Sequence, residues 1–192
     1  MAYYSASDLR SVAGSMTASA ADDLLTKSAA TARDSFDVFL SHSVRDSVVV
    51  YGLMRVLESQ GLTVYVDWIV DRQLERSTVS PATAQVLRQR MRQSRSMVYA
   101  TSRAASSSRW MPWELGFFDG LKGQQRISVC PIEDGSGGSF VGQEYIGLYK
   151  LMERLSSNGQ PKPYVTRNSS TEAQSMGSFV AGTSDFSLVR RS

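Results

Sequence analysis

Residues 36–42, FDVFLSH, form a short apolar run that ends in small polar residues, a pattern typical of a buried strand in a parallel sheet. A helix pattern follows, which starts at Ser43 and Asp46 and ends at Gly61. Its inward face is predicted to consist of Val49, Leu53, Val56 and Leu57. Residues 62–68, LTVYVDW, are then predicted to form a second strand.

The same alternation of strand and helix continues through the middle of the chain. A helix is predicted from Ser80 and Pro81, with Val86, Leu87 and Met91 facing inward. Further strands are predicted at 97–102 (MVYATS), 127–132 (ISVCPI) and 144–152 (EYIGLYKLM). Strands that alternate with helices of this length indicate an α/β fold with a parallel sheet and right-handed crossovers. The predicted core includes Phe39, Val64, Val66, Val98, Leu115, Val129 and Cys130.

Both ends of the chain differ in composition from this α/β region. Residues 1–35 are rich in Ala, Ser and Thr and are predicted to be an N-terminal helical extension, which leaves 36–155 as the main domain. Residues 156–192 are predicted to be a C-terminal extension. Within it we expect a loop at SSNGQPKP, a short strand at PYVTR and a weak helix from Ser170 to Val180.

Composition narrows the classes of function. The formal net charge of +3 is small and scattered over 192 residues, so no nucleic-acid partner is expected. The single cysteine, Cys130, excludes an internal disulfide framework and favours a reducing, cytoplasmic location. His42 is the only histidine, so no histidine-based metal site is expected. Neither a secretory signal nor a membrane-spanning run is present in the sequence, and no membrane partner is expected.

Residues 106–121, SSSRWMPWELGFFDGL, are predicted to form an aromatic helix that carries a carboxylate. Its apolar stripe is Trp110, Trp113, Phe117 and Leu121, and Glu114 lies at the border of that stripe. A carboxylate among aromatic rings is partly desolvated, which costs free energy unless the group has a partner or a chemical role. Two structural roles stay open for Glu114, namely stabilisation of the helix dipole and an ion pair with Arg109 or with a base distant in the sequence.

Open parallel sheets bind ligands at the carboxyl ends of their strands. In this chain, polar residues follow the predicted strands at those ends. They are Ser41, His42 and Ser43 after the first strand, Asp67 and Trp68 after the second, and Thr101 and Ser102 after the third. No G-x-G-x-x-G or P-loop motif is present, so a dinucleotide fingerprint and a P-loop nucleotide site are excluded. The third strand also lacks the aspartate that a response-regulator phosphorylation site would require.

Three blocks, FDVFLSHSVRD, GLTVYVDW and SMVYATSRAASSSRWMPWELG, resemble the successive signatures of a bacterial TIR (Toll/interleukin-1 receptor) domain. The resemblance runs from about Phe36 to Ile132, and more weakly to Leu155. It implies a flavodoxin-like sheet of five parallel strands in the order 2-1-3-4-5, with helices on both faces. The layout of the whole chain is similar to that of stand-alone TIR proteins of Thoeris-type antiphage defence.

The resemblance also implies functional roles. Trp110 and Glu114 fall on the W-x-x-x-E pattern, whose glutamate is catalytic in TIR domains that cleave NAD⁺. Residues 69–80 take the place of the BB loop, through which TIR domains self-associate. A downstream effector that senses the nucleotide product is a further implied partner.

NAD⁺ would be the substrate, with no separate cofactor and no metal. Its nicotinamide leaves as a neutral molecule, so one carboxylate that stabilises the oxocarbenium-like transition state can suffice. Glu114 is the predicted catalytic residue, and the predicted substrate contacts are Ser41, His42, Ser43, Asp67, Trp68 and Trp110. The product, linear ADP-ribose or a cyclic isomer, stays open at this point. Two alternatives are a non-catalytic TIR assembly module and a nucleoside deoxyribosyltransferase-like enzyme.

Overall fold

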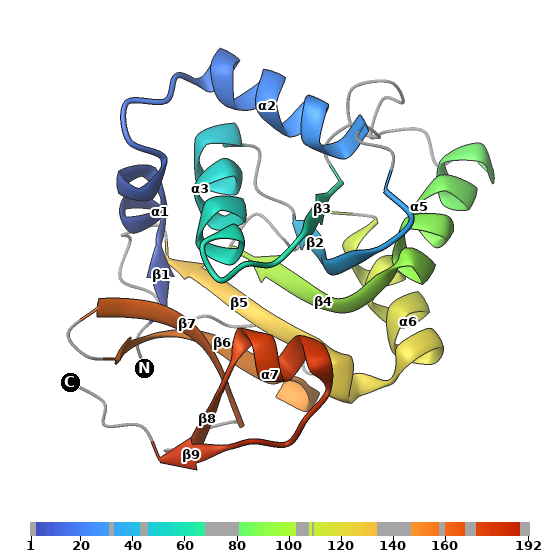
Figure 1. Cartoon of the computed structure of the whole chain (residues 1–192). Coiled ribbons are helices and arrows are strands. Elements are labelled where there is room, and N and C mark those ends of the chain that lie inside the picture. Colours follow the sequence, from blue (N-terminus) through green and yellow to red (C-terminus); the bar gives the residue numbers. More distant parts are fainter. Residues whose placement is uncertain are drawn as a thin grey trace.

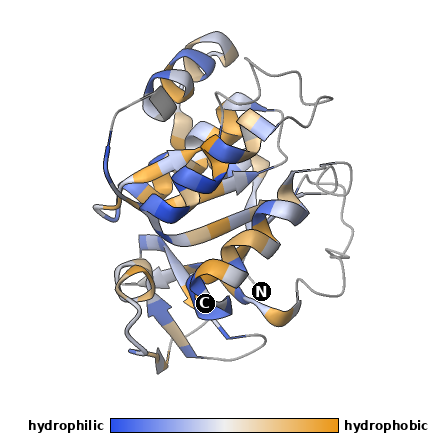
Figure 2. Cartoon of the chain, turned by 90° about the vertical axis from the view of Figure 1, so that its right-hand side faces the viewer, coloured by the Kyte–Doolittle hydropathy of each residue, from blue (hydrophilic) through white to orange (hydrophobic). Residues whose placement is uncertain are grey.

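A computed structural model of the chain describes residues 3–30, 33–42, 46–67, 81–102, 108, 110–133, 147–157, 160–167 and 172–188. Within these residues, no helix combines the length and the apolar character that crossing a bilayer requires. Apolar residues concentrate in the strands and on the helices that cover them (Figure 2).

Five parallel strands form the centre of the sheet (Figure 1). They are β2 (Phe36–His42), β3 (Val64–Val66), β4 (Ser94–Thr101), β5 (Ile127–Glu133) and β6 (Lys150–Ser157). Their spatial order is β3-β2-β4-β5-β6, and each neighbouring pair is parallel. Counted from β2, this is the order 2-1-3-4-5, so the predicted flavodoxin-like arrangement is confirmed.

Four more strands make the sheet larger than predicted. Three antiparallel strands extend it beyond β6, namely β7 (Gln160–Thr166), β8 (Glu172–Ser175) and β9 (Ser187–Leu188). The short strand β1 (Tyr4–Ser5) pairs in parallel with the carboxyl end of β5. Within the described residues the sheet therefore has nine strands, where the sequence predicted five parallel strands and a short strand at PYVTR, which overlaps β7.

The loop predicted for residues 156–163 is wrong, because β6 and β7 form a hairpin there. Pro161 and Pro163 had indicated a loop, because proline is rare inside sheets. Both prolines lie in the part of β7 that pairs with β6 alone, while β8 pairs only with Tyr164–Thr166. Proline is tolerated there because that edge of β7 has no second strand to receive a hydrogen bond.

The fifth parallel strand begins later than predicted, at Lys150 instead of residue 144. Leu148, inside the predicted strand, is instead 68% exposed. The strand continues through Glu153, whose side chain is buried and accepts a 2.6 Å hydrogen bond from the Thr166 hydroxyl. A partner on the neighbouring strand thus lets a charged residue occupy a buried strand position, which the apolar pattern could not indicate.

Helices cover both faces of the sheet, as predicted. On one face lie α1 (Ala6–Ala13), α3 (Ser47–Glu58) and α7 (Met176–Ala181), with α2 (Ala18–Ala30) packed on α3. On the other face lie α5 (Pro81–Gln93) and α6 (Met111–Lys122), and a 3₁₀ turn, η2 (Gln124–Arg126), leads into β5. Figure 1 shows α1 and α3 on the side of the sheet opposite α5 and α6. Asp46 caps α3 by accepting hydrogen bonds from the backbone N–H groups of Val48 and Val49.

The predicted core is confirmed, since all seven of its residues are buried: Phe39, Val64, Val66, Val98, Leu115, Val129 and Cys130. Two inward faces were predicted incorrectly. In α5, Leu87 and Met91 are buried, but Val86 is 46% exposed because it lies about 100° around the helix from Leu87.

The buried face of α6 is Met111, Glu114, Leu115 and Phe118, instead of the predicted aromatic stripe. Trp110, Trp113 and Phe117 are half-buried, and Leu121 is exposed. Arginines of α5 lie over this stripe, because the Arg88 guanidinium is 5.3 Å from the Trp113 ring and the Arg92 guanidinium is 5.6 Å from the Phe117 ring. The stripe therefore lies at the margin of the buried cluster on this face and packs partly against α5.

Residues of both extensions share the core of the main sheet. Leu9 and Leu25, and at the other end Phe179 and Val180, belong to the same buried cluster as Leu40. The boundaries at residues 35 and 155 stay predictions.

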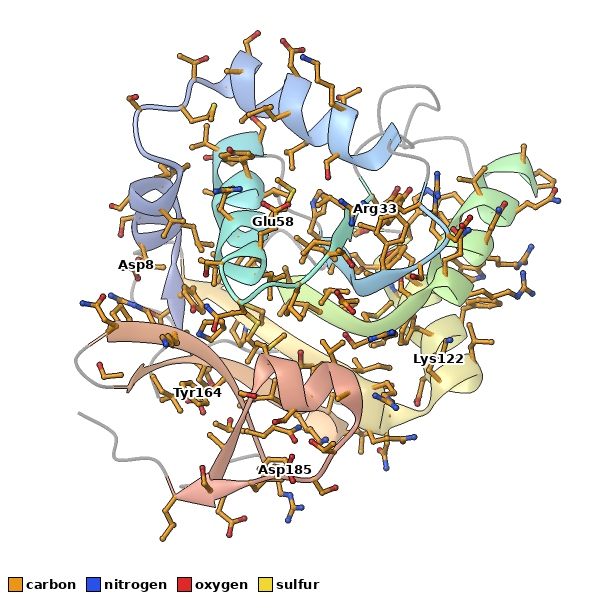
Figure 3. All side chains as sticks on the ribbon, in the orientation of Figure 1. Asp8, Arg33, Glu58, Lys122, Tyr164 and Asp185 are labelled. Carbon is orange, nitrogen blue, oxygen red and sulfur yellow. The ribbon has the colours of Figure 1, made fainter. Side chains whose placement is uncertain are left out.

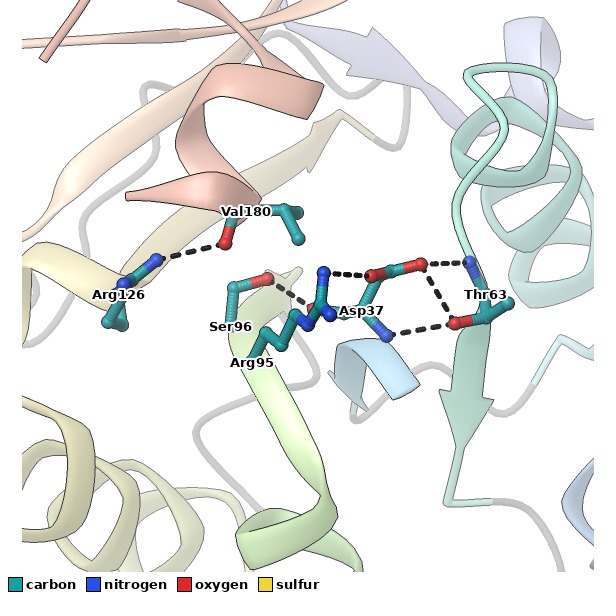
Figure 4. Close-up of polar contacts among 6 residues, drawn as sticks. All are labelled: Asp37, Thr63, Arg95, Ser96, Arg126 and Val180. Atoms are coloured by element: carbon teal, nitrogen blue, oxygen red, sulfur yellow. Dashed lines mark hydrogen bonds and ion pairs between the residues drawn. The ribbon is translucent and has the colours of Figure 1, made fainter. Parts of the chain in front are cut away.

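Polar contacts fix the amino ends of the central strands (Figure 4). The Asp37 carboxylate accepts 2.9 Å hydrogen bonds from the backbone N–H and the hydroxyl of Thr63. The Ser96 hydroxyl donates to the Asp37 carbonyl at 2.7 Å, and Arg95 approaches the carboxylate at 3.4 Å. These contacts join β2 to both of its neighbours.

Ion pairs attach α1 to the rest of the molecule. Asp8, labelled in Figure 3, pairs with Arg154 of β6 at 3.2 Å, and Arg10 pairs with Asp46 at 2.5 Å. Asp8 also accepts hydrogen bonds from Ser5, and these bonds, more than the Arg154 charge, lower the pKa of Asp8. These ion pairs hold α1 against β6 and the start of α3, and the pairing of β1 with β5 adds a third attachment.

Candidate active site

Glu114 lies in the interior, against the carboxyl end of β2. It occupies the first turn of α6, where Pro112 favours the helix start, and its side chain is only 2% exposed. The Ser41 hydroxyl donates a 2.5 Å hydrogen bond to Oε2 of Glu114, and Ser41 is itself fully buried. A short hydrogen bond from a hydroxyl to a carboxylate is among the strong kinds, so it holds the carboxylate in a fixed orientation.

Asp67 supplies a second buried carboxylate at this end of the sheet. Phe39 of β2 pairs with Tyr65 of β3, so the next positions on the same face are Ser41 and Asp67. Asp67 is 8% exposed and follows the last residue of β3. Ser41, Asp67 and Glu114 therefore lie on the face of the sheet that α6 covers.

Tyr65 lies on the same face of the sheet, two residues before Asp67 in the sequence. Its ring stacks on Phe39 and lies edge-on to Phe36, with 5.4 Å between ring centroids in each pair. Burial, and after it the negative charge of Asp67, raise the pKa of the Tyr65 hydroxyl. The charge of Glu114 acts in the same direction and Arg90 opposes it. The hydroxyl is therefore a neutral group at physiological pH, close enough to sense both carboxylates.

Trp110 precedes α6 and lies about one helical turn before Glu114. Its backbone carbonyl accepts the 2.8 Å hydrogen bond from the Glu114 N–H, and its ring meets that of Trp113 edge-on at 5.4 Å. The indole is half-buried, so part of one ring surface can receive a ligand. Its role as a substrate contact stays a prediction.

The other predicted contacts are placed differently or are not described. His42 is 5% exposed, and the alternation along β2 puts it on the face opposite Ser41, toward α3. Its strand partner is Ala100, which belongs to the core on that face. Ser43, Trp68 and residues 69–80 lie outside the described residues, as does Arg109, the suggested ion-pair partner of Glu114.

The sequence reasoning missed Tyr65 and its neighbour Arg90. Tyr65 precedes Asp67 by two residues in LTVYVDW, so strand alternation could have placed both on one face. Arg90 carries no such signal, because its guanidinium reaches the Tyr65 ring, at 5.4 Å, from a separate helix.

This arrangement suits the stabilisation of positive charge. Two buried carboxylates and a neutral phenol meet where the dielectric is low, so electrostatic interactions with a developing cation are strong. A carboxylate can also accept hydrogen bonds from sugar hydroxyls, which fixes the position of a ribose.

Two curated proteins are similar in sequence to this chain. A Bacillus cereus (strain MSX-D12) protein, named as a probable 3′ cyclic ADP-D-ribose synthase, ThsB′, is 49% identical over 120 residues, which are 62% of this chain and 61% of that protein. A Cytobacillus dafuensis protein, provisionally named cyclic ADP-D-ribose synthase TIR2, is 34% identical over 83 residues, which are 43% of this chain and 22% of that protein. The matched part is thus less than two thirds of either relative's length. No protein-family model matches the chain.

The strand order of the sheet is the one that the resemblance to TIR domains implies. Both relatives are named as cyclic ADP-D-ribose synthases and the name of the second includes TIR, so the chain is similar in sequence to bacterial proteins of the family that its motif blocks resemble.

Proposed function

We propose that this protein cleaves the bond between nicotinamide and ribose in NAD⁺ and closes the remainder into a cyclic ADP-ribose. The names of the two relatives, cyclic ADP-D-ribose synthases, support the reaction class. The observation that carries the proposal is the buried Glu114 carboxylate, oriented by Ser41 at the carboxyl edge of the sheet.

The chemistry needs no general acid at the leaving group. The glycosidic bond breaks with its electron pair moving to the pyridinium nitrogen, so nicotinamide leaves neutral and the ribosyl carbon becomes cationic. Glu114 stabilises this cation and orients the ribose, and Ser41 fixes Glu114 in position. A hydroxyl or an adenine nitrogen of the same molecule then forms the new bond to the ribosyl carbon, and one proton is released. Attack by water instead yields linear ADP-ribose, nicotinamide and one proton.

The protein acts with partners as well as with NAD⁺. Residues 69–80 mediate self-association, an effector senses the cyclic product as a defence signal, and the protein acts in the cytoplasm, which the single cysteine favours.

The test is to incubate the purified protein with NAD⁺ and to separate nicotinamide and the ADP-ribose isomers by chromatography. Glu114→Gln preserves the side-chain volume and removes the charge, so we expect turnover to fall by about 100- to 1000-fold. The control is Glu58→Gln, which removes a carboxylate that pairs with Arg55 at 2.8 Å on α3 and should leave turnover unchanged. Wild-type turnover in Glu114→Gln would refute the catalytic role. Absence of nicotinamide release from the wild type at every protein concentration would favour an assembly module instead.

A further inference from the structure

Three basic side chains gather at the edge of the sheet opposite Glu114. Lys150 is the first residue of β6 and pairs with Ser128 near the start of β5, while Arg126 directly precedes β5. Arg167 directly follows β7, whose Thr166 pairs with Leu151. The pairing of three strands therefore brings together residues 126, 150 and 167, which are separate in the sequence.

Carbonyl groups and aromatic rings hold these cations in place. The Arg126 guanidinium donates a 2.9 Å hydrogen bond to the Val180 carbonyl at the end of α7 (Figure 4). Lys150 Nζ lies 5.4 Å from the Phe186 ring and 5.5 Å from the Phe179 ring, and the Arg167 guanidinium lies 4.4 Å from the Phe186 ring. Because Lys150 and Arg167 contact the same ring, their charges are close together.

The turn after α7 lies against the Arg126 guanidinium. Gly182 has φ +77°, and a side chain at this position would overlap the Arg126 guanidinium. Only glycine adopts this backbone conformation easily and also leaves the required space. The Arg126 guanidinium thus lies directly against residue 182.

Carboxylates do not neutralise the cluster within the described residues, where no ion pair includes Arg126, Lys150 or Arg167. The nearby Asp185 instead accepts a 2.6 Å hydrogen bond from the Thr183 hydroxyl. Burial lowers the pKa of Lys150, and the positive charges of Arg167 and Arg126 lower it further. The three cations therefore repel one another, and an anion bound among them would relieve that repulsion.

We propose that Arg126, Lys150 and Arg167 form a binding site for a phosphoryl group, carried by a small molecule such as inorganic pyrophosphate or a nucleotide. Two planar guanidinium groups match the oxygen geometry of phosphate, and the ammonium adds a point charge. Lys150 and Arg167 lie over the same ring, and Arg126 is two residues before Ser128, the strand partner of Lys150. Such a compact cluster fits one phosphoryl or diphosphate group and not the repeated phosphates of a nucleic acid. Arg167 is exposed and the other two are half-exposed, so a ligand can reach them. The site is separate from the proposed catalytic edge.

The test measures chemical modification of Lys150 in the intact protein, which does not depend on catalytic activity. Wild-type protein is reductively methylated at matched ionic strength in the presence of chloride, inorganic phosphate, pyrophosphate or ADP, and modification at Lys150 is quantified by mass spectrometry. We expect pyrophosphate and ADP to protect Lys150 while leaving the exposed Lys162 unprotected. Equal protection by both identifies the phosphoryl group as the ligand, and stronger protection by ADP identifies a nucleotide.

A variant gives an independent measurement. Arg167→Gln should weaken protection of Lys150 by pyrophosphate about tenfold, as loss of one charge-assisted contact predicts. Lys162→Gln removes one positive charge from the same strand, β7, and should leave protection unchanged. The proposal is overturned if no phosphate compound protects Lys150 better than chloride, or if only an acidic polypeptide such as polyglutamate does so.

Discussion

At the scale of single residues, the hydrogen bond between Ser41 and Glu114 joins two groups that are 73 positions apart in the sequence. Both side chains are almost completely buried, one at the end of β2 and the other in the first turn of α6. The bond therefore connects the sheet to the helix that carries the proposed catalytic carboxylate.

We expect Ser41→Ala to lower turnover of NAD⁺ by about 10- to 100-fold, because a hydrogen bond to a charged group contributes about 1.5–3 kcal/mol. Initial rates of nicotinamide release measure this effect. Ser96→Ala is the matched control, since it also removes a fully buried hydroxyl, here a 2.7 Å donor to the Asp37 carbonyl. Ser96→Ala should lose about 1 kcal/mol of stability and Ser41→Ala about 1.5–3 kcal/mol, but only Ser41→Ala should lose activity. Equal activity in the two variants would contradict the positioning role of Ser41.

Cys130 provides a residue-scale test of the core. Burial raises the pKa of its thiol to about 12, so the folded protein holds it as a neutral thiol at physiological pH. We expect native protein to react with a thiol reagent at least about 1000-fold more slowly than unfolded protein, because reaction requires unfolding. Rapid labelling of the native protein would show that β5 is not in the interior.

The same thiol predicts how stability depends on alkaline pH. In the unfolded chain the thiol ionises near pH 8.5, well below its folded pKa of about 12. Its contribution to stability is therefore complete below about pH 8.5 and is lost as the pH rises toward 12. Denaturant unfolding at several pH values should show a steeper alkaline loss in wild type than in Cys130→Ala.

At the scale of elements, the contact between α1 and α3 depends on close backbone approach. Gly52 of α3 is buried, and a Cβ atom at this position would overlap the backbone carbonyl oxygen of Leu9. Helix α1, the first helix of the N-terminal extension, therefore packs directly against the backbone of α3. Its ion pairs, Arg10 with Asp46 and Asp8 with Arg154, add two further attachments.

We expect Gly52→Ala to destabilise the protein by about 1–3 kcal/mol, because backbone atoms cannot move aside as a flexible side chain can. The control is Gly120→Ala in α6, where a Cβ atom would meet open space. That substitution should stabilise the protein by about 0.5–1 kcal/mol through helix propensity. Thermal or denaturant unfolding distinguishes the two, and stabilisation by both would mean that α1 does not pack closely on α3.

At the scale of the whole molecule, segments from both ends complete the core and the sheet. Leu9 from α1 and Phe179 from α7 are buried in one cluster with the central strands, and β7–β9 extend the sheet beyond β6. One shared core favours a single cooperative unfolding transition.

Assembly is the other property at this scale. If residues 69–80 mediate self-association, specific activity should rise with protein concentration, because more of the protein is then assembled. Reversing Arg72 and Arg76 to Glu should weaken assembly and activity together with little change in thermal stability, since a run of alternating charges is expected to be solvated and solvated charges contribute little to folding. Reversal of the exposed Lys162 on β7 serves as the control. Light scattering and initial rates over a dilution series measure both effects, and a flat, high specific activity would contradict the assembly requirement.

The sequence by itself determined the alternation of strands and helices and the seven buried core positions, because these depend on periodicity and residue type along one segment. The catalytic role of Glu114 stays a prediction, which came from the resemblance to TIR domains. The order 2-1-3-4-5 came from resemblance of the motif blocks. Only the tertiary structure decided how each element is rotated and which elements meet. Thus α6 buries Glu114 and Phe118 while its aromatic stripe lies beside α5, and β2 turns Ser41 and His42 to opposite faces.

The physical reason is that periodicity fixes the relative positions of side chains within an element, whereas neighbouring elements fix its orientation. An aromatic stripe and a mixed apolar face have the same helical spacing, so packing has to choose between them. Likewise, the pairing of β5, β6 and β7 alone brings Arg126, Lys150 and Arg167 to one edge, because strand register is a property of the sheet and not of any single strand.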